Sequence, residues 1–183
     1  LSRKDAALFA VLALEGPQPR DRLAGLVWPD VPGARASSNL RQRLFRLRQQ
    51  TQHLLIDSGE LLRPASGLAI DVQGLGTSAA GELALVVADP GDELLGSMDF
   101  VEDGDLLANW VRQARAQWRS RRIDLLTGQA ARHEAASELA AALACVERLL
   151  VVDPLLEHAW RRLMRLHHLR GDRAAAVASF ERC

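Results

Sequence analysis

Residues 36–50, ASSNLRQRLFRLRQQ, contain four arginines and no acidic residue, although the whole chain of 183 residues has a formal net charge of zero. At about 100° per residue, one stripe of this segment is formed by Ala36, Leu40, Leu44 and Leu47, which predicts an amphipathic helix with that stripe buried. The polar side chains fall on the other faces. The segment therefore predicts a helix that presents a basic surface.

The outward face of this helix carries the side chain types that recognise base pairs. It mixes arginine with hydroxyl and amide side chains, with Phe45 nearby, and its candidate base-reading residues are Ser38, Asn39, Gln42 and Arg46. In the DNA major groove, arginine pairs well with guanine, and asparagine or glutamine with adenine. Arginines beside the helix can reach phosphates, and these candidates are Arg35, Arg41, Arg43 and Arg48.

The alternative is an ordinary solvated helix face. Such a face usually alternates glutamate with arginine, because pairs of opposite charge four residues apart stabilise a helix. No acidic residue occurs between Asp30 and Asp57, so nothing in the segment relieves the repulsion between its arginines. This pattern favours nucleic acid binding.

The segments around this helix predict a winged helix-turn-helix domain over residues 1–75. A first helix is expected over residues 1–16, with Ser2 as N-cap, Gly16 as its end, and a buried face formed by Leu8, Val11, Leu12 and Leu14. A second helix is expected between Pro19 and Pro29, with Leu23, Leu26 and Val27 inward. Short strands are expected at 54–57, 60–63 and 68–72, and Arg63, the only basic residue there, is the candidate phosphate contact of the wing. Three helices followed by a hairpin are typical of a winged helix.

Residues 105–183 predict an all-α domain with tetratricopeptide-like repeats, after a connection at 76–104. Trp160-x-x-Leu163, His167 and Ala176-x-x-x-Phe180 follow the tetratricopeptide spacing. The residues 34 positions earlier are Leu126, Ala142 and Val146. The alternative is a generic bundle rich in alanine and leucine. The predicted fold class is therefore mainly α, with one small hairpin near the N-terminus.

Charge divides the chain into a basic part, net +3 over residues 1–75, and an acidic part, net −3 over residues 76–183. A second group of arginines lies at the start of the acidic part. We expect it to be solvated or to pair with Glu102, Asp103 and Asp105; its members are Arg112, Arg115, Arg119, Arg121 and Arg122.

No catalytic, cofactor or metal motif is found. His133-Glu134 lacks the second histidine of a zinc protease motif because Ser137 occupies that position, and Gly74-Leu75-Gly76 lacks the third glycine of a dinucleotide loop. Cys145 and Cys183 do not form a Cys-x-x-Cys pair, and Cys145 is expected in a core. We expect a protein that is not an enzyme and has no cofactor. With no signal peptide or long apolar run, we expect it in the cytoplasm without membrane contact.

Four blocks of this sequence resemble the SARP-type bacterial transcriptional activators, whose second half is the bacterial transcriptional activator domain. They are LSRKDAALFAVLALEG (1–16), RDRLAGLVWPD (20–30), ASSNLRQRLFRLRQ (36–49) and LLVVDPLLEHAWRRLMRLHHLRGDRAAAVASFERC (149–183). The resemblance implies an OmpR-like winged helix that binds double-stranded promoter DNA, with homodimers on direct repeats and recruitment of RNA polymerase holoenzyme.

The chain departs from that family in two places. The small β-sheet that precedes the first helix in such winged helices is missing, and the activator domain of the family extends beyond Cys183, so we expect this chain to be a piece of a longer protein. The alternative function is a protein–protein interaction module of a larger signalling protein, with no DNA binding of its own.

Overall fold

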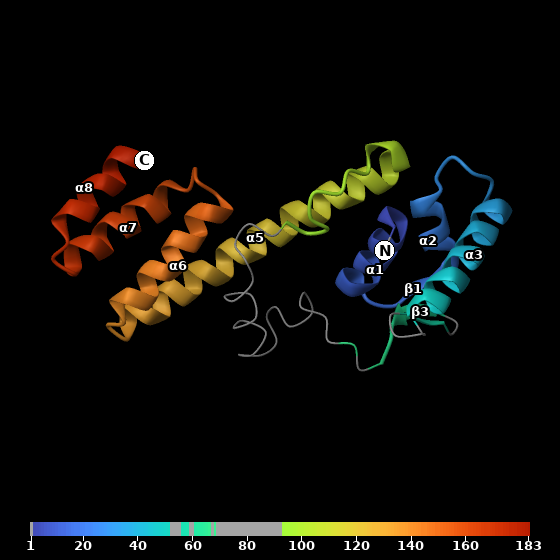
Figure 1. Ribbon diagram of the computed structural model, residues 1–183, viewed down its shortest axis with the longest axis horizontal. Coiled ribbons are helices and arrows are strands. Elements are labelled where there is room, and N and C mark those ends of the chain that lie inside the picture. The colour runs from blue at the N-terminus through green and yellow to red at the C-terminus, as the bar shows by residue number, and fades with distance from the viewer. Residues whose placement is uncertain (1, 52–55, 59–60, 67, 69–92) are drawn as a thin grey trace. The chain divides into compact units, whose positions relative to one another are not determined.

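A computed structural model describes residues 2–51, 56–58, 61–66, 68 and 93–183. These residues are mainly helical with one small antiparallel sheet, which confirms the predicted fold class. They form two compact units (Figure 1). The described residues among 1–81 make the first unit together with residues 93–115, and residues 116–183 make the second.

Helix α1 (Arg3–Glu15) begins and ends as its sequence predicts. The Ser2 hydroxyl accepts a hydrogen bond from the Asp5 N–H, and the Asp5 carboxylate accepts one from the Ser2 N–H, which is a capping box. Gly16 ends the helix at a φ of 80°, a conformation that glycine adopts readily. Leu8, Val11 and Leu12 are buried, whereas Leu14 is only half-buried, so its assignment to the buried face was wrong.

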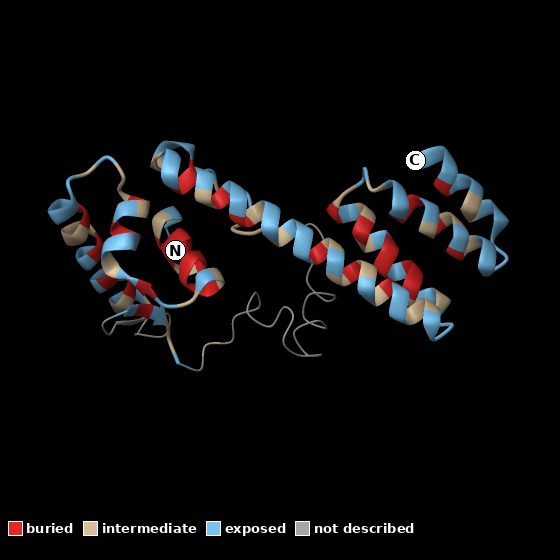
Figure 2. Ribbon diagram, turned by 180° about the vertical axis from the view of Figure 1, so that it is seen from behind, coloured by how far each residue is buried: buried red, intermediate tan, exposed pale blue. Residues whose placement is uncertain are grey.

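Helices α2 (Arg20–Val27) and α3 (Gly33–Thr51) complete the core of the first unit. The predicted stripe of α3 is buried, with Ala36, Leu40, Leu44 and Leu47 all at most 3% exposed. These side chains form one cluster with residues of α1 and α2, among them Leu23 and Val27. Figure 2 shows that each of these three helices has buried residues. Leu26, predicted to face inward, is half-buried against this cluster.

A three-stranded antiparallel sheet lies near the C-terminal end of α3 (Figure 1). Its strands are β1 (Gln18–Pro19), β2 (Ile56–Ser58) and β3 (Leu61–Pro64), in the order β1-β3-β2. Two predicted strands are therefore present, and Leu62 of β3 is buried in the core cluster. Most of the third predicted strand, residues 69–72, lies outside the described residues. The third strand of the sheet is β1, which pairs with β3 and was not predicted.

Residues 93–115 pack on α1. They contain the 3₁₀ helix η1 (Val101–Asp103) and the first third of α5 (Asp105–Ala135). Phe100, Leu107 and Val111 form a second cluster with Ala7 of α1. Residues 93–104, which the sequence assigned to a connection, thus contribute to the core of the first unit. Residues 76–92 of that connection lie outside the described residues.

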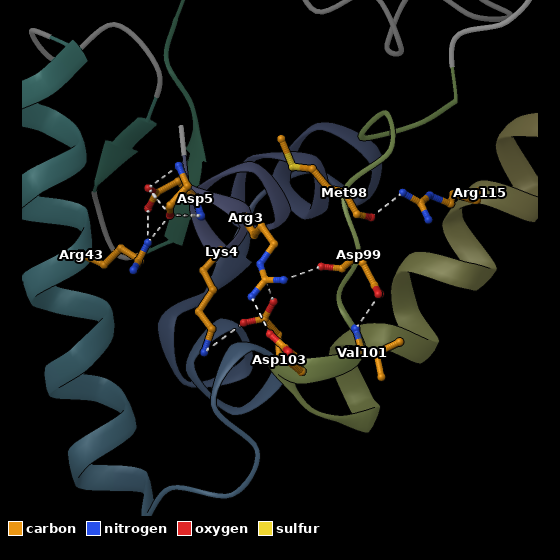
Figure 3. Close-up of polar contacts among 11 residues, drawn as sticks. Arg3, Lys4, Asp5, Arg43, Met98, Asp99, Val101, Asp103 and Arg115 are labelled. Atoms are coloured by element: carbon orange, nitrogen blue, oxygen red, sulfur yellow. Dashed lines mark hydrogen bonds and ion pairs between the residues drawn. The ribbon is translucent and has the colours of Figure 1, made fainter.

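Polar contacts strengthen this packing (Figure 3). The Asp103 carboxylate forms ion pairs with Arg3, at 3.4 Å, and with Lys4, at 3.6 Å. The Arg115 guanidinium donates hydrogen bonds of 2.9–3.0 Å to the carbonyl oxygens of Leu94, Gly96 and Met98. Arg115 therefore bonds to backbone carbonyls and not to the expected acidic residues, of which Glu102 and Asp103 pair with Arg3 and Lys4 of α1.

Gly104 is expected to tolerate no side chain. Its φ is 100°, and an added Cβ would lie 2.7 Å from Pro29 Cγ, so Gly104→Ala combines a strained backbone with overpacking. We expect it to lower the free energy of unfolding by about 1–3 kcal/mol, measured by urea denaturation followed by circular dichroism. Gly25 in α2 has no atom within 4 Å of an added Cβ, so Gly25→Ala should raise that free energy by about 0.4–1 kcal/mol. Equal stability of the two variants would contradict this explanation.

The second unit consists of the rest of α5 with α6 (Leu139–Val152), α7 (Glu157–Leu169) and α8 (Arg173–Arg182). Consecutive helices of the series α6, α7 and α8 pack on each other. The core of this unit contains Leu126, Ala142, Val146 and Trp160, which are four of the residues that the repeat pattern names; His167 and Ala176 are half-buried.

Phe180 departs from the repeat pattern. It lies 34 residues after the fully buried Val146, yet 70% of its surface is exposed. The difference arises because α7 packs over α6, while no described element covers the corresponding side of α8. The repeat spacing therefore identifies residues at equivalent positions of the two repeats, but it does not predict that both residues are buried.

Candidate nucleic-acid interface

Much of α3 is exposed (Figure 2), and its exposed residues include arginines and glutamines. Arg35, Arg41, Gln42 and Arg46 are exposed. Ser38 and Asn39, near the N-terminal end of the helix, are half-buried. Because the leucine stripe fixes which side of α3 faces the core, the remaining sides necessarily carry these polar residues. The four predicted base-reading residues thus lie on one helix. Among these four, Gln42 and Arg46 are exposed, whereas the other two are half-buried.

Three arginines on this face have free guanidinium groups. The side chains of Arg35, Arg41 and Arg46 make no ion pair or hydrogen bond with any described residue. The arginines of α7 differ: Arg161 forms an ion pair of 2.7 Å with Glu157, while Arg162 and Arg165 both bind the Glu134 carboxylate. Positive charge on α3 is therefore available to an external anion, whereas these α7 arginines are already paired with carboxylates within the protein.

The guanidinium group of Arg43, in contrast, has partners within the protein. Its guanidinium forms an ion pair of 3.0 Å with the Asp5 carboxylate and donates a hydrogen bond to the Ser2 hydroxyl (Figure 3). It thus ties α3 to the capped start of α1. Its assignment to a phosphate stays a prediction, and a phosphate contact would require Arg43 to exchange Asp5 for the phosphate.

The two remaining phosphate candidates lie toward the end of α3 and on the hairpin. Arg48 is half-buried, and its Nε has no hydrogen-bond partner among the described residues. Arg63 is exposed on β3, where it lies opposite Asp57 of β2 in the strand register. Leu62, beside Arg63, belongs to the same core cluster as Leu47 of α3, which places β3 close to the last turns of that helix.

Phe45 is the residue of this face to which the sequence gave no role. It is 64% exposed, and with Arg41, Gln42 and Arg46 it lines a shallow hollow of about 400 Å³. A large apolar side chain on an otherwise polar helix face is the signal that sequence reasoning could have used.

The described residues offer neither a metal-binding cluster nor a membrane-spanning helix. No group of three His, Cys, Asp or Glu residues there could hold a metal ion, and none of the described helices has the length and apolar character needed to cross a membrane. Cys145 is buried, and this burial raises the pKa of its thiol, although Arg148 and Arg162 oppose the shift. It is therefore a protonated core residue at neutral pH, as its sequence context indicates.

Comparison with known proteins shows a similarity over the C-terminal part of the chain. Residues 97–183 match the family model of the bacterial transcriptional activator domain. The match includes η1 and all of α5, and it extends through α8. The matched family is, by its description, a domain of transcriptional activators, and the match covers just under half of the chain. No curated protein and no solved structure matched the chain significantly.

Proposed function

We propose, from the similarity of residues 97–183 to a transcriptional activator domain, that this protein is a sequence-specific DNA-binding activator of transcription. The first unit would bind double-stranded promoter DNA as a winged helix, and the helical part would contact RNA polymerase or another regulator. The observation that carries the proposal is the outer face of α3, where free arginines alternate with serine, asparagine and glutamine.

The order of elements supports this use of α3. In helix-turn-helix proteins the second helix of the pair lies in the major groove, and its N-terminal residues contact base edges. Here α2 and α3 form that pair, and the hairpin of β2 and β3 follows directly. β1 joins the hairpin to the body of the unit. We place the DNA-binding part within residues 1–75 and the activator part within 105–183.

The free side chains suggest a division of roles. Gln42 and Arg46 are the foremost candidates for base reading, with Ser38 and Asn39 closer to the protein body. Arg35 and Arg41 are the foremost candidates for phosphate contacts, since their side chains carry no internal partner. Arg63 would contact the backbone from the wing. Arg48 would add a further phosphate contact, and homodimers on direct repeats would double this interface.

A second function is favoured by a different surface. Val177 and Phe180 lie three residues apart on α8, so they share one face of the helix, and they are 58% and 70% exposed. An apolar helix face of this kind suits binding of another protein. A protein–protein interaction module without DNA binding is therefore the alternative, and the DNA experiment separates the two.

Fluorescence anisotropy with random duplex DNA tests the proposal. We expect the full chain to bind with roughly micromolar affinity at low salt, and log K to fall linearly with log salt concentration. Arg41→Ala should make that slope shallower by about 0.9, the value for one lost phosphate contact. Arg161→Ala, an exposed arginine on α7, is the matched control and should leave the slope unchanged. Binding without salt dependence, or equal slopes for both variants, would argue against DNA binding through α3.

A further inference from the structure

We propose that Phe45 is a specificity-determining residue that contacts the C5-methyl group of a thymine in the bound DNA. This inference rests on the proposed function and adds an apolar element to the recognition of base pairs by α3. It assigns a role to the exposed ring of Phe45, which does not pack in the core of the first unit.

The burial of α3 shows that Phe45 does not serve the core. All four core residues of the helix are at most 3% exposed, while Phe45 is 64% exposed. It is also the only exposed large apolar side chain among the described residues of α3. An exposed phenylalanine ring lacks the hydrophobic stabilisation that burial would provide. Its exposure therefore points to a partner whose surface carries an apolar group.

The neighbours of Phe45 indicate what that partner is. On a helix, residues three and four apart are adjacent, so Phe45 lies beside Gln42 and Arg41 on one side and beside Arg46 in sequence. All four line the same hollow. A partner that binds in this hollow needs an apolar group that can contact Phe45. Close to that group it needs hydrogen-bond acceptors for the arginines, and a donor and an acceptor for the amide of Gln42.

The major groove satisfies these conditions. Thymine carries a methyl group there, guanine carries two acceptors that suit arginine, and adenine carries the donor and acceptor that suit glutamine. Phenylalanine is among the side chains that contact the thymine methyl. We therefore expect a fixed thymine within one or two base pairs of the positions read by Gln42 and Arg46.

Replacement of thymine by uracil tests this contact, because it removes the methyl group and leaves base pairing intact. Bound sequences are first selected from a random duplex pool with the wild-type chain. Each thymine of the selected duplex is then replaced in turn by uracil, and affinity is measured by anisotropy. For the wild type we expect a loss of about fourfold at one or two thymines, the contribution of one buried methyl-sized group.

Two variants make the test specific to Phe45. Phe45→Ala should bind thymine and uracil duplexes equally at those positions. Phe180→Ala removes a similarly exposed phenylalanine from the second unit, 70% exposed against 64% for Phe45, and should keep the wild-type loss. Both variants are expected to retain the circular dichroism spectrum of the wild type, since neither ring is buried.

The outcomes separate this inference from the proposed function. If the wild type selects a sequence but no thymine is sensitive to uracil, the contact does not exist. The inference also fails if Phe45→Ala keeps the wild-type sensitivity, or if the selected sequence contains no fixed thymine. If the wild type selects no sequence at all, the proposed DNA binding fails as well. Loss of a protein partner by Phe45→Ala, with uracil sensitivity unchanged, would assign the ring to a protein interface and overturn the inference.

Discussion

Replacing Trp160 with alanine is expected to lower the free energy of unfolding of the second unit by about 3–5 kcal/mol. The side chain is 6% exposed and lies in the core formed by α5, α6 and α7. Its indole N–H donates a hydrogen bond of 2.8 Å to the Pro154 carbonyl oxygen, and the Arg182 guanidinium lies 5.4 Å from the ring centre. Truncation therefore creates a cavity, leaves a carbonyl without its donor and removes a cation–π contact between α7 and α8.

Hydrogen exchange of the backbone amides in α6 and α7 measures this loss locally, and urea denaturation of the full chain measures it globally. Phe180→Ala is the control, because the tetratricopeptide spacing assigns Phe180 to the core as well. At 70% exposure this variant should change stability by less than about 0.5 kcal/mol. Similar losses for both variants would mean that the repeat pattern, not the observed burial, describes the second unit.

Replacing Arg46 with alanine is expected to weaken binding to the selected DNA by roughly 1–3 kcal/mol and to relax the preference at one base pair. Arg46 is exposed and makes no hydrogen bond or ion pair with another described residue, so the free energy of unfolding should change little. The loss would therefore report on DNA contact alone. Anisotropy with four duplexes that differ only at the affected base pair measures both quantities.

Arg41→Ala provides the comparison for Arg46→Ala. A phosphate contact carries no sequence information, so this variant should weaken all four duplexes by the same factor and change mainly the salt slope. The assignment of the two arginines would be reversed if Arg46→Ala weakened the four duplexes equally and Arg41→Ala did not.

Features that depend on neighbours along the chain were predictable from the sequence. The buried stripe of α3 follows from a period of 3.6 residues, and the start of α1 follows from Ser2 and Asp5, which are three residues apart. The helical repeat of the second unit was predictable for the same reason, since the spacing of Leu126 and Trp160 is visible in the sequence. The base-reading and phosphate roles on α3 stay predictions until DNA is bound.

Features that depend on distant contacts were not predictable. β1 has two residues, too few to show any periodicity, and it exists because β3 offers a free edge. Arg43 and Asp5 are 38 residues apart, so nothing in the arginine-rich segment distinguishes Arg43 from its free neighbours. Leu14 is apolar and correctly spaced, yet the packing of α1 leaves it half-buried. The exposure of Phe180 likewise depends on what packs over α8.

The packing of residues 93–115 on α1 affects when the first unit can fold during synthesis of the chain. If the first unit ended at residue 75, it could close once that residue had left the ribosome. Phe100, Leu107 and Val111 cover Ala7, so the closure must instead await about 40 more residues, which take roughly 2–8 s at typical elongation rates. During that interval the emerging chain exposes an incomplete apolar surface, which is the state that chaperones recognise. The first unit therefore completes its fold only while the segment that matches the activator domain is already being made.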